Sequence, residues 1–182
     1  MKTLYLKSLM LFGATWLIMT HSCKPKDHDH HEHDAIVRVQ LLLTDTATKT
    51  PAGYFVWSDP DGIGGNNPTQ IDTIKLNANS VYSGTIRLYA QHDGHEHEIT
   101  SEIVEQKNDH LFVYKNIFGE LTIYITDRDD KNLPVGLQTI WVTGNISGGQ
   151  VNIVLRHQPG VKNGTEAPGD TDIDVVFPLV IK

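Results

Sequence analysis

The sequence has only one cysteine, Cys23, and this scarcity limits the chemistry available to the chain. A lone cysteine excludes an internal disulfide and a cysteine-rich zinc cluster. Basic residues are also few, with 15 Lys and Arg against 22 Asp and Glu, which gives a net charge of −7. Because the chain is acidic, we expect it to bind neither nucleic acid nor anionic lipid by electrostatic attraction.

Long apolar runs and catalytic motifs are absent too. The apolar stretch at residues 8–20 has 13 residues, whereas a membrane-spanning helix needs about 20. There is no G-x-S-x-G, P-loop, H-E-x-x-H or glycine-rich dinucleotide motif. We therefore expect a protein that is not an enzyme. The enzymatic alternative is a three-histidine zinc site that activates water, and it lacks an evident general base.

Residues 1–22 have the features of an export signal. Lys2 and Lys7 precede the apolar stretch "SLMLFGATWLIMT", and the small residue Ser22 precedes Cys23. This resembles a bacterial lipoprotein signal, although "THS" replaces the usual Leu at −3 and Ala or Gly at −1. The resemblance implies lipidation of Cys23 and a lipid-anchored protein of the outer membrane, facing the cell surface or the periplasm. The alternative is a secreted protein with a free thiol.

A charged segment follows the cysteine. Residues 24–34, "KPKDHDHHEHD", contain four histidines and four acidic residues, and no apolar residue except Pro25. Such a segment cannot pack into a core. We interpret residues 23–34 as the lipidated cysteine with a flexible, histidine-rich tether. After removal of residues 1–22 the chain has 13 basic and 22 acidic residues, a net charge of −9.

Residues 35–182 alternate repeatedly between apolar and polar positions. One strand face is predicted in "AIVRVQLLLT", and similar faces are predicted in "LTIYIT", "QVNIVLRH" and "TDIDVVFPLVI". Loops rich in Gly, Pro, Asn and Asp separate these segments. Residues 100–108, "TSEIVEQKN", are the one stretch that could form a helical turn, and they fit a strand nearly as well. We therefore predict one all-β domain, an antiparallel β-sandwich of immunoglobulin or fibronectin type with about nine strands.

Several stretches, taken in order, resemble those of a poorly characterised group of Bacteroidota envelope lipoproteins. They are "FVWSDPDGIGGNNP", "LNANSVYSGTIRLY", "EITSEIVEQKNDHLFVY", "LRHQPG" and "TDIDVVFPLVI". Some members of that group carry the label "type 1 periplasmic binding fold". That label implies an α/β fold, which the strand pattern here does not favour. The resemblance implies an envelope lipoprotein and supplies no catalytic residues.

Seven of the ten histidines fall in two clusters. His28, His30, His31 and His33 lie in the tether, and "QHDGHEHE" contains His92, His95 and His97. The "DG" pair at 93 and 94 predicts a two-residue hairpin turn. In that register His92 faces His95, and His97 lies on the same side. The glutamates of this segment would point to the other side.

Three converging imidazoles are a common zinc arrangement, and they also suit Cu²⁺ or Ni²⁺. Water, Glu105, His110 or a tether histidine could complete the site. The alternative is an exposed, polar hairpin tip without a function. His110 and His157 each flank a predicted strand, so we expect two separate structural histidines.

Two acidic loops are weaker candidates for Ca²⁺. One contains Asp59 and Asp61, and the other contains Asp127, Asp129 and Asp130. Neither loop has the ligand spacing of an EF-hand, so turn formation is the simpler interpretation of both. Trp57 and Trp141 are expected to pack in or near the core.

The sequence thus favours an outer-membrane lipoprotein that binds Zn²⁺, or Cu²⁺ or Ni²⁺, and buffers it or delivers it to an importer. The alternative is a non-enzymatic, adhesin-like envelope protein in which the histidines are incidental.

Overall fold

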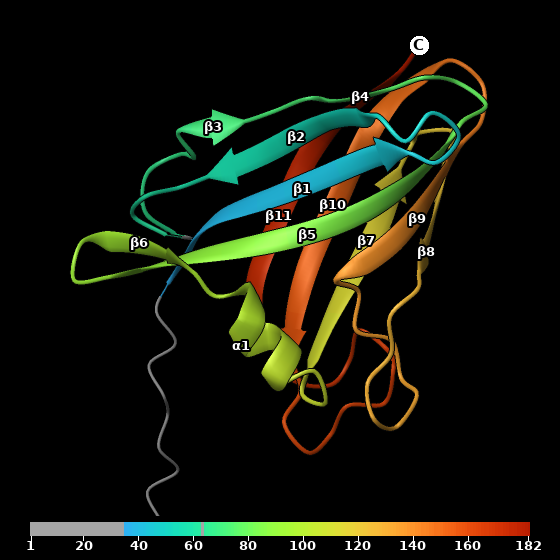
Figure 1. Ribbon diagram of the computed structural model, residues 1–182. Helices are drawn as coiled ribbons and strands as arrows, with labels where there is room; N and C mark the ends of the chain where they lie inside the picture. Colours follow the sequence, from blue (N-terminus) through green and yellow to red (C-terminus); the bar gives the residue numbers. More distant parts are fainter. Residues whose placement is uncertain (1–34, 63) are drawn as a thin grey trace, which may run out of the picture. The chain divides into compact units, whose positions relative to one another are not determined.

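The fold was analysed in a computed structural model that describes residues 35–62 and 64–182. These residues belong to one compact unit. Two β-sheets pack face to face, and one short helix lies at one end of them (Figure 1). The prediction of an all-β sandwich is therefore confirmed.

The larger sheet, sheet A, has the strand order β3-β2-β1-β5-β9-β8, and β6 extends it by pairing with β5. Its seven strands are β1 (Ile36–Asp45), β2 (Pro51–Ser58), β3 (Gln70–Ile71), β5 (Val81–His92), β6 (His95–Glu98), β8 (Leu121–Ile125) and β9 (Gln138–Thr143). All its pairings are antiparallel.

The smaller sheet, sheet B, has the order β4-β11-β10-β7. Its strands are β4 (Ile74–Leu76), β7 (His110–Ile117), β10 (Ser147–His157) and β11 (Asp170–Ile181). The short β4 pairs in parallel with β11, so sheet B is not purely antiparallel. The described residues contain eleven strands rather than about nine, because β3 and β4 are too short to reveal a two-residue period. The immunoglobulin or fibronectin type remains a prediction.

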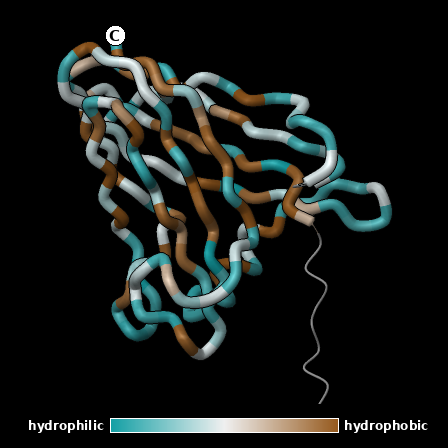
Figure 2. The backbone as a smooth tube through the Cα atoms, turned by 180° about the vertical axis from the view of Figure 1, so that it is seen from behind, coloured by the Kyte–Doolittle hydropathy of each residue, from teal (hydrophilic) through white to brown (hydrophobic). Residues whose placement is uncertain are grey.

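The predicted inner faces are correct for the long strands. In β1 the four alternate residues Val37, Val39, Leu41 and Leu43 are all buried. In β11 the same holds for every second residue from Ile173 to Ile181. The buried side chains of both sheets form one cluster, which includes Trp57 and Trp141 as expected. Figure 2 shows the corresponding alternation of hydrophobic and hydrophilic residues along the strands.

Helix α1 (Thr100–Glu105) directly follows the β5–β6 hairpin. Its only buried residue is Ile103, which joins the core cluster. The Thr100 hydroxyl accepts a hydrogen bond from the Leu88 amide at 3.0 Å and so ties the start of α1 to β5. The helical turn considered for residues 100–108 is therefore present, over residues 100–105. The turn after α1 leads into β7 at His110.

Candidate functional site: the histidine hairpin

The β5–β6 hairpin has the predicted turn and register. Asp93 and Gly94 have φ angles of 49° and 78°, as a type I′ turn requires. His92 pairs with His95, and Ala90 pairs with His97. The Ile99 amide donates to the Leu88 carbonyl at 2.9 Å, so the ladder continues in the same register beyond β6.

The three hairpin histidines lie on the side of sheet A that faces the core. Leu88 and Ala90 are fully buried, and His92 continues their alternation at the end of β5. Beyond the core edge this side becomes open, and all residues of β6 are exposed. The hairpin protrudes from the rest of sheet A (Figure 1).

The opposite side of the hairpin is held by ion pairs. Arg38 of β1 pairs with Glu96 and lies 3.8 Å from the centre of the Tyr89 ring. Arg87 and Glu98 are 3.8 Å apart. As predicted, these glutamates point away from the histidines. Asp93 lies in the turn itself, and its Oδ2 is 3.5 Å from His92 Nε2.

The hairpin does not form a complete metal site as it stands. Within residues 35–62 and 64–182, no three His, Cys, Asp or Glu side chains are arranged so that they could hold a metal ion. The His92 side chain is 66% exposed, so it has room to change rotamer. The register therefore brings the three imidazoles to one face without bringing their nitrogens to one point. The tether histidines and Cys23 lie outside the described residues.

A second histidine cluster, which the sequence did not predict, occupies one end of sheet B. His110 of β7 pairs with His157 of β10, and their rings stack at 4.8 Å with an angle of 11° between the planes. His110 Nε2 lies 3.6 Å from Asp172 Oδ2. The expectation that the two histidines stand apart was wrong, because the register of β7 and β10 places them side by side. Arg156, next to His157, donates to the Gly169 carbonyl and the Thr171 hydroxyl and so braces the following loop.

The acidic residues of the loop at 127–130 make hydrogen bonds and ion pairs that stabilise the fold. The Asp127 carboxylate accepts hydrogen bonds from the Gly136 and Leu137 amides. Asp129 accepts from two amides of its own loop and pairs with Lys162. Asp130 pairs with Lys107 at 2.5 Å. These contacts support the turn interpretation, and Ca²⁺ binding here remains only a prediction.

The loop with Asp59 and Asp61 differs from this one, because it contains a buried carboxylate oxygen that accepts no hydrogen bond from the described residues. Asp59 is 2% exposed, and its Oδ1 has no hydrogen-bond partner among the described residues. Burial raises the pKa of Asp59, and the adjacent Asp61 carboxyl group raises it further. The Asn66 amide, as the largest influence, lowers the pKa of Asp61. Two carboxyl groups supply only part of the six to eight oxygens of a Ca²⁺ site, so calcium also remains a prediction here.

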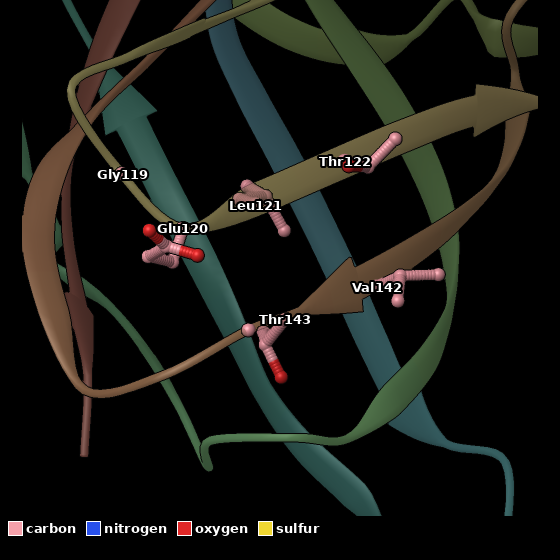
Figure 3. Close-up of a pocket in the computed structure, with 7 residues that line it drawn as sticks. Gly119, Glu120, Leu121, Thr122, Val142 and Thr143 are labelled. Atoms are coloured by element: carbon pink, nitrogen blue, oxygen red, sulfur yellow. The ribbon is translucent and has the colours of Figure 1, made fainter.

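A surface hollow of about 330 Å³ lies where β8 begins and β9 ends (Figure 3). Residues 119–122 and 142–144 line it, and Glu120 is the only ionisable residue among them. The Thr143 hydroxyl donates to the Asn77 carbonyl at 2.7 Å and so anchors the turn before β5. The hollow therefore presents no pair of groups for acid–base catalysis.

No helix within the described part of the chain is long and apolar enough to cross a membrane. Comparison with models of protein families, with curated proteins and with solved structures finds no match for this chain.

Proposed function

We propose that this protein is a lipid-anchored lipoprotein of the outer membrane that binds a transition-metal ion, Zn²⁺ or else Cu²⁺ or Ni²⁺. The binding groups are His92, His95 and His97, assisted by the histidines of the tether. The protein buffers the metal or delivers it to an outer-membrane importer. It performs no catalysis. The observation that carries the proposal is the β5–β6 register, which pairs His92 with His95 and turns His97 to the same side.

The proposal has a simple geometric basis. Paired residues in an antiparallel ladder have Cα atoms about 5.5 Å apart, so two opposed imidazoles can reach one ion with zinc–nitrogen bonds of about 2.0–2.1 Å. His97 supplies a third ligand after a rotamer change. Water or one of the tether residues His28, His30, His31 and His33 completes the coordination. Because the tether is attached to the same chain, its weak ligands act at high effective concentration.

Calorimetric titration of the full chain with Zn²⁺ at pH 7.5 tests the proposal. A background variant with the four tether histidines changed to asparagine isolates the hairpin. In that background we expect about one Zn²⁺ to bind at micromolar or tighter affinity, and His92→Ala, His95→Ala and His97→Ala together to abolish the binding.

A matched control exchanges two neighbouring residues of β6 and so leaves the amino-acid composition unchanged. The double variant His97→Glu with Glu98→His moves one imidazole to the opposite side of β6, and it removes the long contact between Arg87 and Glu98, which contributes little to stability. We expect weaker binding in this variant. Equal zinc affinity in the background protein, the control and the triple variant would exclude the hairpin as the site.

One observation favours the alternative function of a non-enzymatic interaction protein. Asp45 is the only acidic residue in β1, β2, β5, β8 and β9, although the whole chain has a net charge of −7. On the outer face of this sheet Tyr54 and Tyr124 are 58% and 56% exposed. A face with few carboxylates and with exposed tyrosines suits an adhesin-like contact with a glycan. Binding to immobilised envelope polysaccharide that is lost in the variant Tyr54→Ala with Tyr124→Ala, and not in the histidine variants, would favour this function.

A further inference from the structure

Two apolar side chains protrude from turns at the end of the sandwich where β8 begins. Phe118, between β7 and β8, is 93% exposed, and Ile146, between β9 and β10, is 77% exposed. They are the two most exposed of the large apolar residues that the structure describes. The Glu120 amide donates to the Ser147 hydroxyl at 3.0 Å and so joins the two turns. Exposed apolar side chains that gather in this way mark a contact surface.

Phe118 is held in a backbone conformation that does not suit it. Its φ angle is 68°, in the left-handed region that glycine adopts readily and that bulky residues rarely adopt. The Asn116 side chain holds the turn, because its Nδ2 donates to the Gly119 and Leu121 carbonyls at 2.5 and 2.8 Å. Phe118 therefore strains the backbone without burying its ring. An outlier of this kind indicates a role in binding rather than in stability.

The hollow of about 330 Å³ adjoins both turns in the chain (Figure 3). Its lining begins directly after Phe118, at Gly119, and ends two residues before Ile146, at Gly144. Glu120 lies over Gly144, since a Cβ at position 144 would be 2.7 Å from Glu120 Oε2. Glycine at this position therefore leaves room for the carboxylate. No other described residue forms a hydrogen bond or an ion pair with that carboxylate.

The charge of the hollow determines which ligand suits it. Glu120 is the only charged residue within 116–122 and 142–149, the segments that form the two turns and the lining. A carboxylate among uncharged groups is complementary to an ammonium or guanidinium group, with which it forms charge-assisted hydrogen bonds. The apolar tips beside it are complementary to an apolar side chain of the same ligand.

We propose that this end of the sandwich binds a segment of a partner protein in which Lys or Arg lies next to an apolar residue. The cationic group enters the hollow and pairs with Glu120, and the apolar side chain packs against Phe118 and Ile146. The proposal does not depend on metal binding by the hairpin, and it concerns a different surface.

Two other occupants are less compatible with these observations. A lipid bilayer would have to take the Glu120 carboxylate out of water, and anionic headgroups would repel it. A second copy of the chain would bury four tip side chains at about 250 Å² each or less. That area is smaller than the roughly 1,200–2,000 Å² of a stable interface.

The test selects random short peptides, displayed on phage, for binding to the immobilised full chain. We expect enrichment of peptides in which Lys or Arg lies next to an apolar residue. The most enriched peptide is then synthesised, and fluorescence anisotropy measures its Kd. Phe118→Ala and Glu120→Gln should each weaken binding by about tenfold or more, as the loss of a central interface contact does. A peptide whose basic residue is changed to Gln should bind the parent and Glu120→Gln equally weakly.

Three further variants serve as controls. Tyr54→Ala removes an exposed aromatic ring from β2, and Glu105→Gln removes an exposed carboxylate from α1, so both should bind the peptide as tightly as the parent. Phe118→Gly separates binding from folding, because glycine suits the φ angle of 68°. It should weaken binding without lowering the urea midpoint.

Three results would overturn the proposal. One is a selection without enrichment of peptides that combine a basic and an apolar residue. Another is equal affinity of Phe118→Ala, Glu120→Gln and the two controls for the selected peptide. The third is binding to phosphatidylcholine vesicles, or self-association, that is lost in Phe118→Ala, which would assign the tips to a lipid surface or to a second copy of the chain.

Discussion

A buried ion pair joins three loops at the end of the sandwich, and its removal gives a demanding test of the fold. Lys162 Nζ lies 2.9 Å from Asp129 Oδ2, and the two side chains are 1% and 0% exposed. Lys162 also donates to the Lys107 carbonyl at 2.8 Å. The pair therefore connects the loop before β11, the loop before β9 and the turn before β7. We predict that Lys162→Met strongly destabilises the protein.

The expected magnitude follows from what remains after the substitution. Removing one partner of a buried pair costs about 3–5 kcal/mol, because the other charge stays buried without its counter-ion. Asp129 keeps its hydrogen bonds from the Lys131 and Leu133 amides, at 2.9 and 2.8 Å, which limits the loss. We therefore expect about 3 kcal/mol at pH 7, a large part of the roughly 5–15 kcal/mol typical of a whole protein.

The effect of pH has a definite sign. Burial tends to raise the pKa of Asp129, but the hydrogen bond from Lys162, the Leu133 amide and the charge of Lys162 outweigh it and lower the pKa. A lowered folded-state pKa contributes stability above the unfolded value of about 3.9, and this stability is lost as the pH falls through the folded pKa. In Lys162→Met the pKa of Asp129 rises, so protonation relieves the buried charge. The difference in unfolding free energy between the parent protein and Lys162→Met should therefore become smaller as the pH falls toward 4.

Urea unfolding at pH 7 and pH 4, followed by tryptophan fluorescence, measures both effects. Lys131→Met is the control, since Lys131 is exposed and its substitution should change stability by less than about 0.5 kcal/mol. A deficit for Lys162→Met below 1 kcal/mol at pH 7, or one that grows as the pH falls, would refute the reasoning.

Three further predictions follow from other parts of the molecule. Gly84→Ala should lower the free energy of unfolding by about 1–3 kcal/mol, because the new Cβ would lie 2.4 Å from Thr139 Oγ1 and 2.8 Å from Trp141 Nε1; urea unfolding measures it. Asp59→Asn should raise the urea midpoint at pH 7 but not at pH 3, because the raised pKa of Asp59 means that its ionisation opposes folding only at higher pH. Zinc binding by the hairpin should weaken as the pH falls below about 6.5, where histidine is generally protonated; calorimetry at pH 7.5 and 5.5 measures it.

The sequence predicts best those features that depend on neighbours along the chain. The alternation in β1 and β11 identifies their inner faces, because an unbroken set of apolar residues at every second position lies on one side of each strand. The Asp93–Gly94 pair fixes the hairpin turn, and with it the pairing of His92 and His95. These features are local, so composition and period are sufficient to find them.

Contacts between segments that are distant in the sequence could not be predicted in this way. His110 and His157 belong to strands that β8 and β9 separate in the chain, and their register depends on the assembly of all of sheet B. The only signal in the sequence was that each histidine lies at the end of an apolar strand. The parallel pairing of β4 with β11 was equally hidden, because three residues carry no readable period.

The position of β11 has a consequence for the biogenesis of the protein. This strand comes last among the described strands, yet it lies in the interior of sheet B, between β4 and β10. Until it has been synthesised, β4 has no neighbour in sheet B, and β10 pairs with β7 alone. The sandwich therefore closes late: before β11 is present, one side of the core has only the β7–β10 pair to cover it.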